Sequence, residues 1–192
     1  MKIAITGGIG SGKSYVCRLL QQKGIEVYDC DSAAKRLMNT SKELKEQLSA
    51  LIGSETYTAD GLLNKAAVTQ FLLQSEANIH AINKIVHPAV IEDFLHSGLS
   101  WMESAILHQA DLAHIADYVI AVTAPEDIRI QRIIQRDGIP PEKAQEWIDR
   151  QWPQSEIRRL ADHEIINDGR PLEPQLEALL NKLNNNDIQQ IK

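Results

Sequence analysis

The sequence predicts an α/β fold in which a five-stranded parallel sheet is flanked by helices. One observation is the start of the chain, where the apolar run Lys2–Ile5 leads into a glycine-rich loop and then into a stretch with Val16, Leu19 and Leu20 at helical spacing. The other is a second short apolar run, Ile25–Tyr28, which follows that helix. A strand, a helix and a strand within about thirty residues form a βαβ unit, which implies parallel strands and a right-handed crossover.

The glycine-rich loop, residues 7–14 (GGIGSGKS), matches the phosphate-binding P-loop pattern G-x-x-x-x-G-K-[ST]. Its glycines let the backbone turn with positive φ and bring N–H groups close to phosphate oxygens. Lys13 is placed to reach the β- and γ-phosphates and Ser14 to hold Mg²⁺, while the following helix points its positive end at the same anion. The dinucleotide pattern G-x-G-x-x-G fails, because its third glycine would fall at Lys13. The loop therefore predicts a nucleoside triphosphate site that includes Gly10, Ser11, Gly12, Lys13 and Ser14.

Composition narrows the class of protein further. The 192 residues fit one domain, and the net charge of −6 argues against a broad basic surface for nucleic acid. No apolar stretch is long enough to span a membrane, and the P-loop begins where a signal peptide would need its apolar region. Cys17 and Cys30 are too few for a disulfide framework or a tetrahedral metal site. We therefore expect a cytoplasmic protein without nucleic-acid or membrane partners, and we favour a monomer.

The pattern between residues 32 and 98 is helical. Ser41 is a candidate N-cap for a helix that ends at Gly53, and Ser75 opens a longer helix in which a kink is expected at Pro88. So many helices between two strands indicate a subdomain inserted at the carboxyl edge of the sheet. This edge is where ligands bind in doubly wound folds.

After the insertion, strands and helices alternate again. The predicted strands are Leu99–Leu107, Tyr118–Val122 and Glu164–Ile166. The predicted helices are Glu126–Arg136, a helix that starts at Pro140-Pro141, and a C-terminal helix from about Pro171, whose Asn-rich tail from Asn184 is expected to fray. We divide the single domain into a core (1–31, 99–126 and 160–192), the insertion (32–98) and a lid (about 127–159).

A P-loop serves switches, motors and small-molecule kinases alike. A GTP switch should carry N-K-x-D and D-x-x-G segments, but the Asn83-Lys84 pair lies in a helical pattern and no D-x-x-G occurs. Motors and large ATPases usually need a longer chain and a clear apolar strand that ends in Asp. A small kinase is therefore the leading class.

A kinase needs a group that positions or deprotonates the acceptor hydroxyl. Asp31 is the best candidate, because it follows the second strand and so lies at the same sheet edge as the P-loop. Asp29 would lie on the same face of an extended segment. One of the two could instead cap the next helix, and this alternative weighs more heavily on Asp29.

A kinase also needs cations around the migrating phosphoryl group. The predicted lid carries them in two helices separated by Pro-Pro: Arg132, Arg136, Arg150, Arg158 and Arg159. Closure of such a lid would exclude water and place guanidinium groups on the phosphates. The alternative is that they form solvated helix faces paired with Glu142, Glu146 and Asp149. We favour Arg136 and Arg150 as the ligand-binding pair.

Together these motifs resemble the dephospho-CoA kinase family over almost the whole chain. The matching segments are residues 6–14 (TGGIGSGKS), Asp29-Cys30-Asp31, Asp60-Gly61-Leu62-Leu63, His87-Pro88, Gln135-Arg136-Asp137, and Ala161-Asp162 through Ile165 to Asn167-Asp168-Gly169. The resemblance implies a P-loop kinase fold with a CoA-binding helical insertion. It also implies transfer of the ATP γ-phosphate to the ribose 3′-hydroxyl of dephospho-CoA, which gives CoA and ADP.

The motifs and the resemblance together give a set of expected site residues. The catalytic residues would be Lys13, Asp31 and Arg136. The nucleotide ligands would extend from the P-loop to Tyr15, Arg136 and Asn167. The substrate ligands would be Asp29, Asp31, Lys65, His87 and Arg150. For His87, simple packing at the helix kink is an equally weighted alternative.

Three positions depart from the family's pattern. Tyr15 stands where the family has Thr, Gln109 ends a segment (residues 105–109) that is usually Pro-Leu-Leu-Phe-Glu, and Ile157 replaces a Lys, with Arg158 beside it. The departures at Tyr15 and Gln109 give some weight to an ATP-binding module that has lost catalysis. Another small nucleoside or nucleotide kinase on the same scaffold is the other alternative. The residues central to the chemistry are present: Lys13, Ser14 and Asp31.

Overall fold

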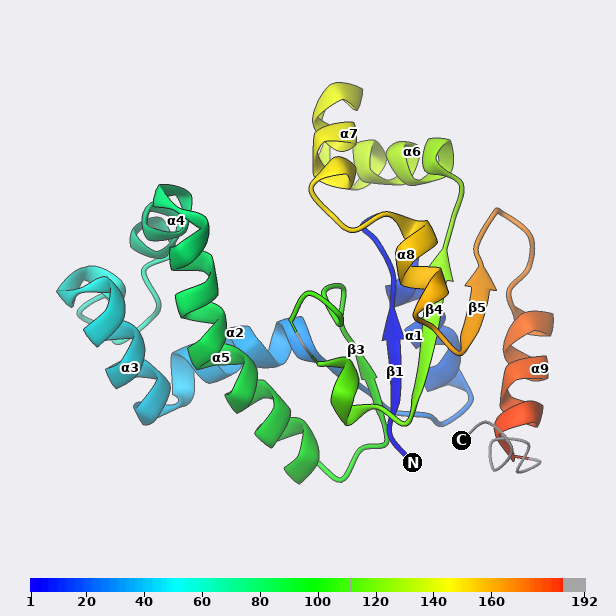
Figure 1. Cartoon of the computed structure of the whole chain (residues 1–192), viewed down its shortest axis with the longest axis horizontal. Coiled ribbons are helices and arrows are strands. Elements are labelled where there is room, and N and C mark those ends of the chain that lie inside the picture. Colours follow the sequence, from blue (N-terminus) through cyan, green and yellow to red (C-terminus); the bar gives the residue numbers. More distant parts are fainter. Residues whose placement is uncertain (111, 185–192) are drawn as a thin grey trace.

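The structure, a computed structural model, describes residues 1–110 and 112–184 and confirms the five-stranded parallel sheet. The strands lie in the order β2–β3–β1–β4–β5, and every neighbouring pair is parallel. Their bounds are Ile3–Thr6 (β1), Val27–Asp29 (β2), Trp101–Glu103 (β3), Tyr118–Thr123 (β4) and His163–Ile166 (β5). All five carboxyl ends therefore meet at one edge, where the P-loop follows β1 (Figure 1). The tail beyond Asn184, for which fraying is expected, lies outside the described residues.

Alternate residues of the strands face two different cores. In β1, Ile3 and Ile5 pack with α1 (Lys13–Gln22) and α9 (Glu173–Asn184), whereas Ala4 belongs to the cluster that holds Phe94 of α5 (Glu76–His96). All four residues of β1 are buried, as are all six of β4. Burial on both faces explains why these strands read as continuous apolar runs rather than as alternating patterns.

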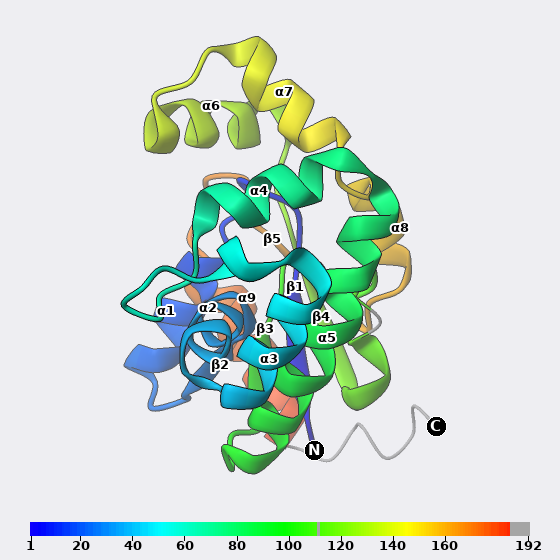
Figure 2. The same cartoon turned by 90° about the vertical axis from the view of Figure 1, so that its left-hand side faces the viewer.

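The insertion consists of α2 (Cys30–Thr40), α3 (Lys42–Ile52), a short 3₁₀ turn η1 (Ser54–Thr56), α4 (Lys65–Gln74) and α5. In Figure 2, where the left-hand side of Figure 1 faces the viewer, α3, α4 and α5 lie in front of the sheet. The predicted cap at Ser41 is confirmed, because Ser41 Oγ accepts from Leu44 N (3.3 Å). Ser75, predicted only to open the longer helix, is also an N-cap, and its Oγ accepts from Asn78 N (3.2 Å). Helix α5 continues through Pro88. None of the described helices is long and apolar enough to cross a membrane.

The lid segment contains α6 (Glu126–Asp137), α7 (Pro141–Asp149) and α8 (Gln154–Arg159). Helices α6 and α7 stand beyond the carboxyl edge of the sheet, and α8 returns alongside β4 (Figure 1). The pair has a small core of its own, made by Ile133, Ala144 and Ile148. The returning segment is also tied to the loop after β3, because Trp152 stacks on His108 with ring centroids 6.0 Å apart and planes within 3°.

The third strand is much shorter than predicted: β3 ends at Glu103, not at Leu107. The ladder to β1 closes with Ser104 N donating to Ile5 O (3.0 Å), and the chain then coils, with Ala110 N donating to Ile106 O (2.7 Å). Leu107 is fully buried in the core, so residues 105–107 are apolar because this loop packs inward. An apolar run alone does not distinguish a buried loop from a strand.

Candidate active site

The P-loop is shaped by what packs behind it as well as by the need to receive phosphate. Gly12 has φ 95°, and a Cβ atom there would collide with the amide of Asn167, at the end of β5. Gly10 has φ 77°, and its Cβ would lie 2.7 Å from the carbonyl oxygen of Arg129 in α6. Left-handed φ and close packing both demand glycine at these two positions. Substitution would therefore displace the loop even in the absence of nucleotide.

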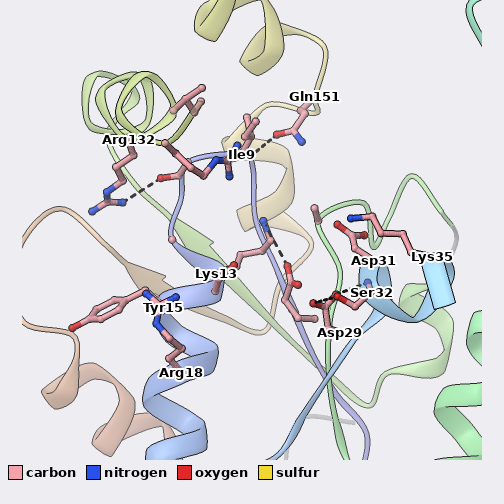
Figure 3. Close-up of a pocket in the computed structure, with 17 residues that line it drawn as sticks. Ile9, Lys13, Tyr15, Arg18, Asp29, Asp31, Ser32, Lys35, Arg132 and Gln151 are labelled. Carbon is pink, nitrogen blue, oxygen red and sulfur yellow. Dashed lines mark hydrogen bonds and ion pairs between the residues drawn. The ribbon is translucent and has the colours of Figure 1, made fainter. Parts of the chain in front are cut away.

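Side chains from the lid segment hold the loop from outside. Arg129, only 3% exposed, donates from Nε to Ile9 O (2.9 Å), and Arg132 donates from Nη1 to Gly10 O (3.2 Å). On the other side of Ile9, its N–H donates to Gln151 Oε1 (2.6 Å), as Figure 3 shows. These contacts therefore hold the loop backbone at Ile9 and Gly10 in place. Sequence reasoning missed Arg129 and Gln151.

Lys13 lies in the middle of the site and is held by two partners. Its Nζ donates to Gly7 O (2.9 Å) and lies 3.7 Å from Glu103 Oε1. Burial lowers the pKa of Lys13, and the Glu103 carboxylate opposes that shift. Burial also raises the pKa of Glu103 to about 6, although Lys13 opposes it. Burial thus disfavours the charged forms of both side chains. A bound ligand that supplies phosphate oxygens would favour the charged form of Lys13.

Glu103 was not among the predicted site residues. It is paired with Asp29 across β2 and β3, and with Ile5 across β1 and β3. This register brings its carboxylate to the sheet edge beside the P-loop. The signal that could have found it is its place as the last residue of the third strand. The predicted strand ran on to Leu107 and concealed that place.

The two aspartates of the D-x-D segment have different surroundings. Asp29 is the N-cap of α2: its carboxylate accepts from Ser32 N (2.9 Å) and from Ser32 Oγ (2.7 Å). Asp31 is exposed in the first turn of the same helix and lies on the pocket wall near Lys35 (Figure 3). The capping alternative therefore applies to Asp29, although both aspartates line the pocket.

A pocket of about 590 Å³ joins these groups into one site. Most of the predicted residues line it, namely Gly10, Gly12, Lys13, Ser14, Tyr15, Asp29, Asp31 and Arg136. Glu103, Lys35 and Arg132 line it too. The P-loop and its lysine form one side, and the carboxylates form the other. Such a pocket can hold a polyphosphate against the loop and a hydroxyl against the acids.

Two of the predicted nucleotide ligands, Ser11 and Asn167, are buried. Ser11 is fully buried, and its Oγ has no hydrogen-bond partner among the described residues. Asn167 is 6% exposed; its Nδ2 donates to Ser11 O (2.9 Å), and its Oδ1 accepts from Arg132 (2.9 Å). The Asn167 amide is thus engaged by the protein at both ends, and the residue stabilises the P-loop.

The outer arginines of the lid are engaged at the surface. Arg136 lines the pocket, but its side chain is 61% exposed and paired with its neighbour Asp137 (2.7 Å). Arg150 is 70% exposed, pairs with Glu146, and does not line this pocket. Arg158 and Arg159 pair with Glu164 (2.8 Å) and Glu156 (2.9 Å). Of these contacts, the Arg150–Glu146 pair is the one that the alternative of solvated helix faces predicted. The binding role of Arg150 stays a prediction.

The insertion forms a second pocket of about 900 Å³ against the loop after β3. His87 lines it, together with His80, Lys84, Gln109 and His114. Burial lowers the pKa of His87, and a hydrogen bond with the Ala110 backbone partly offsets that shift. Lys65 begins α4 and is exposed. It is not among the described residues that line either of these two pockets.

Comparison with known proteins gives a consistent result. The dephospho-CoA kinase family model matches residues 1–173. A dephospho-CoA kinase from Porphyromonas gingivalis is 40% identical over 172 residues, covering 86% of this chain and 85% of the relative. One from Bacteroides fragilis is 36% identical over 188 residues, covering 94% and 91%. A crystal structure from Thermus thermophilus superposes with a TM-score of 0.82 at 29% identity, covering 95% of this chain and 97% of the other.

Proposed function

The chain belongs to the dephospho-CoA kinase family, and we propose that its P-loop pocket is where it uses ATP to phosphorylate dephospho-CoA, the reaction that gives coenzyme A. One observation carries this assignment to the pocket. The P-loop with Lys13 and the carboxylate of Asp31 face the same cavity from opposite sides. A phosphoryl donor and a hydroxyl acceptor can therefore meet between them.

The residues would divide the work as follows. The loop amides and Lys13 would bind the β- and γ-phosphates, with the Lys13 ammonium leaving Gly7 O for a phosphate oxygen. Asp31 would accept the proton of the ribose 3′-hydroxyl, or orient that hydroxyl for in-line attack. Arg136 would exchange its exposed partner Asp137 for the transferred phosphoryl group when the lid closes.

Magnesium fits the oxygen groups of this site. The Ser14 hydroxyl lines the pocket on the P-loop side, and the carboxylates of Asp31 and Glu103 line it opposite. The described residues hold no cluster of three or more His, Cys, Asp or Glu suited to a metal ion. Mg²⁺ needs none, because it is usually held by one or two carboxylates, water and the substrate phosphates. When bound, it would neutralise charge on the β- and γ-phosphates.

We propose that the second pocket holds the remainder of dephospho-CoA. The loop after β3 joins the two cavities, since Ala105 lines the first while Gln109 and Ala110 line the second. An acceptor whose ribose lies at Asp31 could therefore extend along this loop towards His87. Lys84 and the histidines offer donors to its polar arm. The departure at Gln109 lies on this wall and leaves it neutral where the family is usually acidic.

Three further expectations remain proposals: a monomeric state, a cytoplasmic location, and the absence of nucleic-acid partners. The division into core, insertion and lid is also a proposal. It is supported by the separate apolar cluster between α6 and α7 and by the run of four helices between β2 and β3.

The test is a coupled ADP-release assay with ATP, Mg²⁺ and dephospho-CoA, in which the mass and position of the added phosphate are determined. We expect ADP release that depends on dephospho-CoA, and a 3′-phosphorylated product. No turnover despite ATP binding, measured by calorimetry, would favour a silent module. Turnover only with nucleosides or nucleotides would favour another small kinase.

Two matched variants assign the carboxylates. Asp31→Asn should keep ATP binding and lose about 10²–10⁴-fold in kcat. Asp29→Asn is the control, because asparagine caps a helix as well as aspartate does, so most turnover should survive. Near-normal turnover in Asp31→Asn would remove Asp31 from its role. An equal loss in both variants would show that the pair acts together.

A further inference from the structure

Two glutamines that follow α7 bind backbone groups of the core in different ways. Gln154 uses both ends of its amide on one residue: Oε1 accepts from Ala124 N (2.9 Å), and Nε2 donates to Ala124 O (2.8 Å). Gln151 uses one end only. Its Oε1 accepts from Ile9 N (2.6 Å), and its Nε2 donates to none of the described residues. The amide of Gln151 therefore keeps a donor that the described protein groups do not use.

The reason for this difference is the guanidinium of Arg129. Its Nε donates to Ile9 O (2.9 Å), so the carbonyl that a two-ended contact would use already has a donor. Both side chains approach the loop closely at Gly8, where a Cβ atom would lie 2.5 Å from Arg129 Nη2 and 3.2 Å from Gln151 Oε1. Because Ile9 N is a donor, only the amide oxygen of Gln151 can meet it, and this fixes the orientation of the amide.

The unused donor belongs to a side chain that lines the P-loop pocket. Figure 3 shows Gln151 and Arg132 on opposite sides of Ile9, with Asp31 on the side of Gln151. In the proposed reaction the phosphates lie on the P-loop and the acceptor hydroxyl lies at Asp31. Gln151 therefore borders the path of the transferred group. Phosphate oxygens accept hydrogen bonds, so an NH₂ group suits that place.

The backbone that carries Gln151 is held on its C-terminal side by two contacts. The next residue, Trp152, stacks on His108 of the loop after β3. The two-ended contact of Gln154 with Ala124 follows. Gln151 itself is half-buried, unlike the exposed arginines of the outer lid. Its amide is therefore in place at the pocket before any further closure of the lid.

We propose that Gln151 is a ligand of the transferred phosphoryl group: its Oε1 stays on Ile9 N, and its Nε2 donates to a γ-phosphate oxygen of ATP. The proposal rests on the proposed kinase function and adds a neutral donor to the cations Lys13 and Arg136. A donor that the protein already holds in place needs no reorganisation while charge develops on the phosphoryl oxygens. The contact also distinguishes ATP from ADP, since ADP has no γ-phosphate.

The experiment measures calorimetric affinities for ATP and ADP, with Mg²⁺ and without dephospho-CoA, and kcat in the coupled assay. In Gln151→Met we expect the ratio of ATP affinity to ADP affinity to fall about 10-fold and kcat about 10²-fold, because the donor to the γ-phosphate is lost. A residue that only shapes the loop would lower both affinities by the same factor and leave this ratio unchanged. Gln154→Met is the matched control. It should lower the midpoint of urea denaturation and keep the affinity ratio of the wild type, because both ends of its amide serve the fold.

Gln151→Glu separates the two ends of the Gln151 amide. A carboxylate still accepts from Ile9 N but cannot donate to a phosphate oxygen. The midpoint of urea denaturation should therefore stay close to that of the wild type, while the affinity ratio falls at least as far as in Gln151→Met. This variant also provides the test if Gln151→Met does not fold.

Three outcomes would overturn the assignment. An unchanged affinity ratio in Gln151→Met would make Gln151 a structural residue of the loop. A wild-type ratio in Gln151→Glu would show that only the amide oxygen matters. An equal fall of the ratio in Gln154→Met would assign the effect to the whole segment. Failure of the kinase function is distinguishable, because the wild type would then release no ADP, and the calorimetric ratio would still test the contact.

Discussion

The arginines at the base of the lid differ from those on its outer part. Arg129 and Arg132 lie within α6, are buried or half-buried, and bind carbonyl oxygens of the P-loop. Arg136, at the end of the same helix, and Arg150, after α7, are largely exposed and pair with carboxylates of their own segment. One residue type on one lid therefore has two kinds of partner.

The difference teaches which charges build a site and which are free to serve it. A buried guanidinium with backbone partners cannot leave them without orphaning polar groups, so it acts as a structural clamp. An exposed ion pair contributes about 0–1 kcal/mol and exchanges easily. Arg136 combines an exchangeable partner with a place on the pocket wall, whereas Arg150 has only the exchangeable partner. Charge content alone therefore does not identify ligand-binding arginines.

The largest effect should come from Arg129→Met. It leaves Ile9 O without its donor and removes a buried charged side chain that packs against Gly8 and Gly10. We expect the free energy of unfolding, measured by urea denaturation, to fall by about 2–3 kcal/mol, and ATP affinity to fall with it. Arg159→Met, in an exposed pair, is the control and should stay within about 0.5 kcal/mol of wild type. If Arg129→Met does not fold, Arg129→Lys should fold and still lose ATP affinity. Normal affinity in that variant would contradict the clamp.

Arg136→Gln should have the next largest effect, and on a different quantity. Its exposed pair with Asp137 contributes little to folding, so urea denaturation should barely change. If the guanidinium reaches the phosphoryl group in the closed lid, kcat should fall about 10–100-fold while ATP binding by calorimetry changes far less. A stability loss without a loss of kcat would reverse the assignment and make Arg136 a structural residue.

The carboxyl group of Glu103 should make the free energy of unfolding depend on pH. Its pKa is raised from 4.5 to about 6, mainly by burial. Between these values the native state binds more protons than the unfolded state, so the free energy of unfolding falls as pH rises through the window, by about 2 kcal/mol in total. Glu103→Gln should lack this fall in ligand-free urea denaturation from pH 4 to 7. Parallel pH curves for the two proteins would show that the carboxylate is not desolvated in solution.

The sequence could predict what depends on local pattern. The strand, P-loop and helix at residues 2–22, the N-cap Ser41, the helix start at Ser75 and the position of Asp31 at the sheet edge all follow from short-range chemistry. It could not reveal Glu103, because that position depends on register between strands some seventy residues apart along the chain. Nor could it reveal that Arg129 and Gln151 contact Ile9, since those contacts close over 120 and 142 residues. Tertiary placement determines which of several similar side chains enters the site.

Arg150→Gln should give the smallest effect and is the matched control for Arg136→Gln. Its pair with Glu146 is exposed, and the residue lies outside the P-loop pocket. We expect kcat/KM within about twofold of wild type and a free energy of unfolding within about 0.5 kcal/mol, measured as for Arg136→Gln. A tenfold loss of kcat at unchanged stability would mean that lid closure carries Arg150 to the phosphates. An exposed, exchangeable ion pair would then be enough for an arginine to serve the site. A position on the wall of the open pocket would not be required.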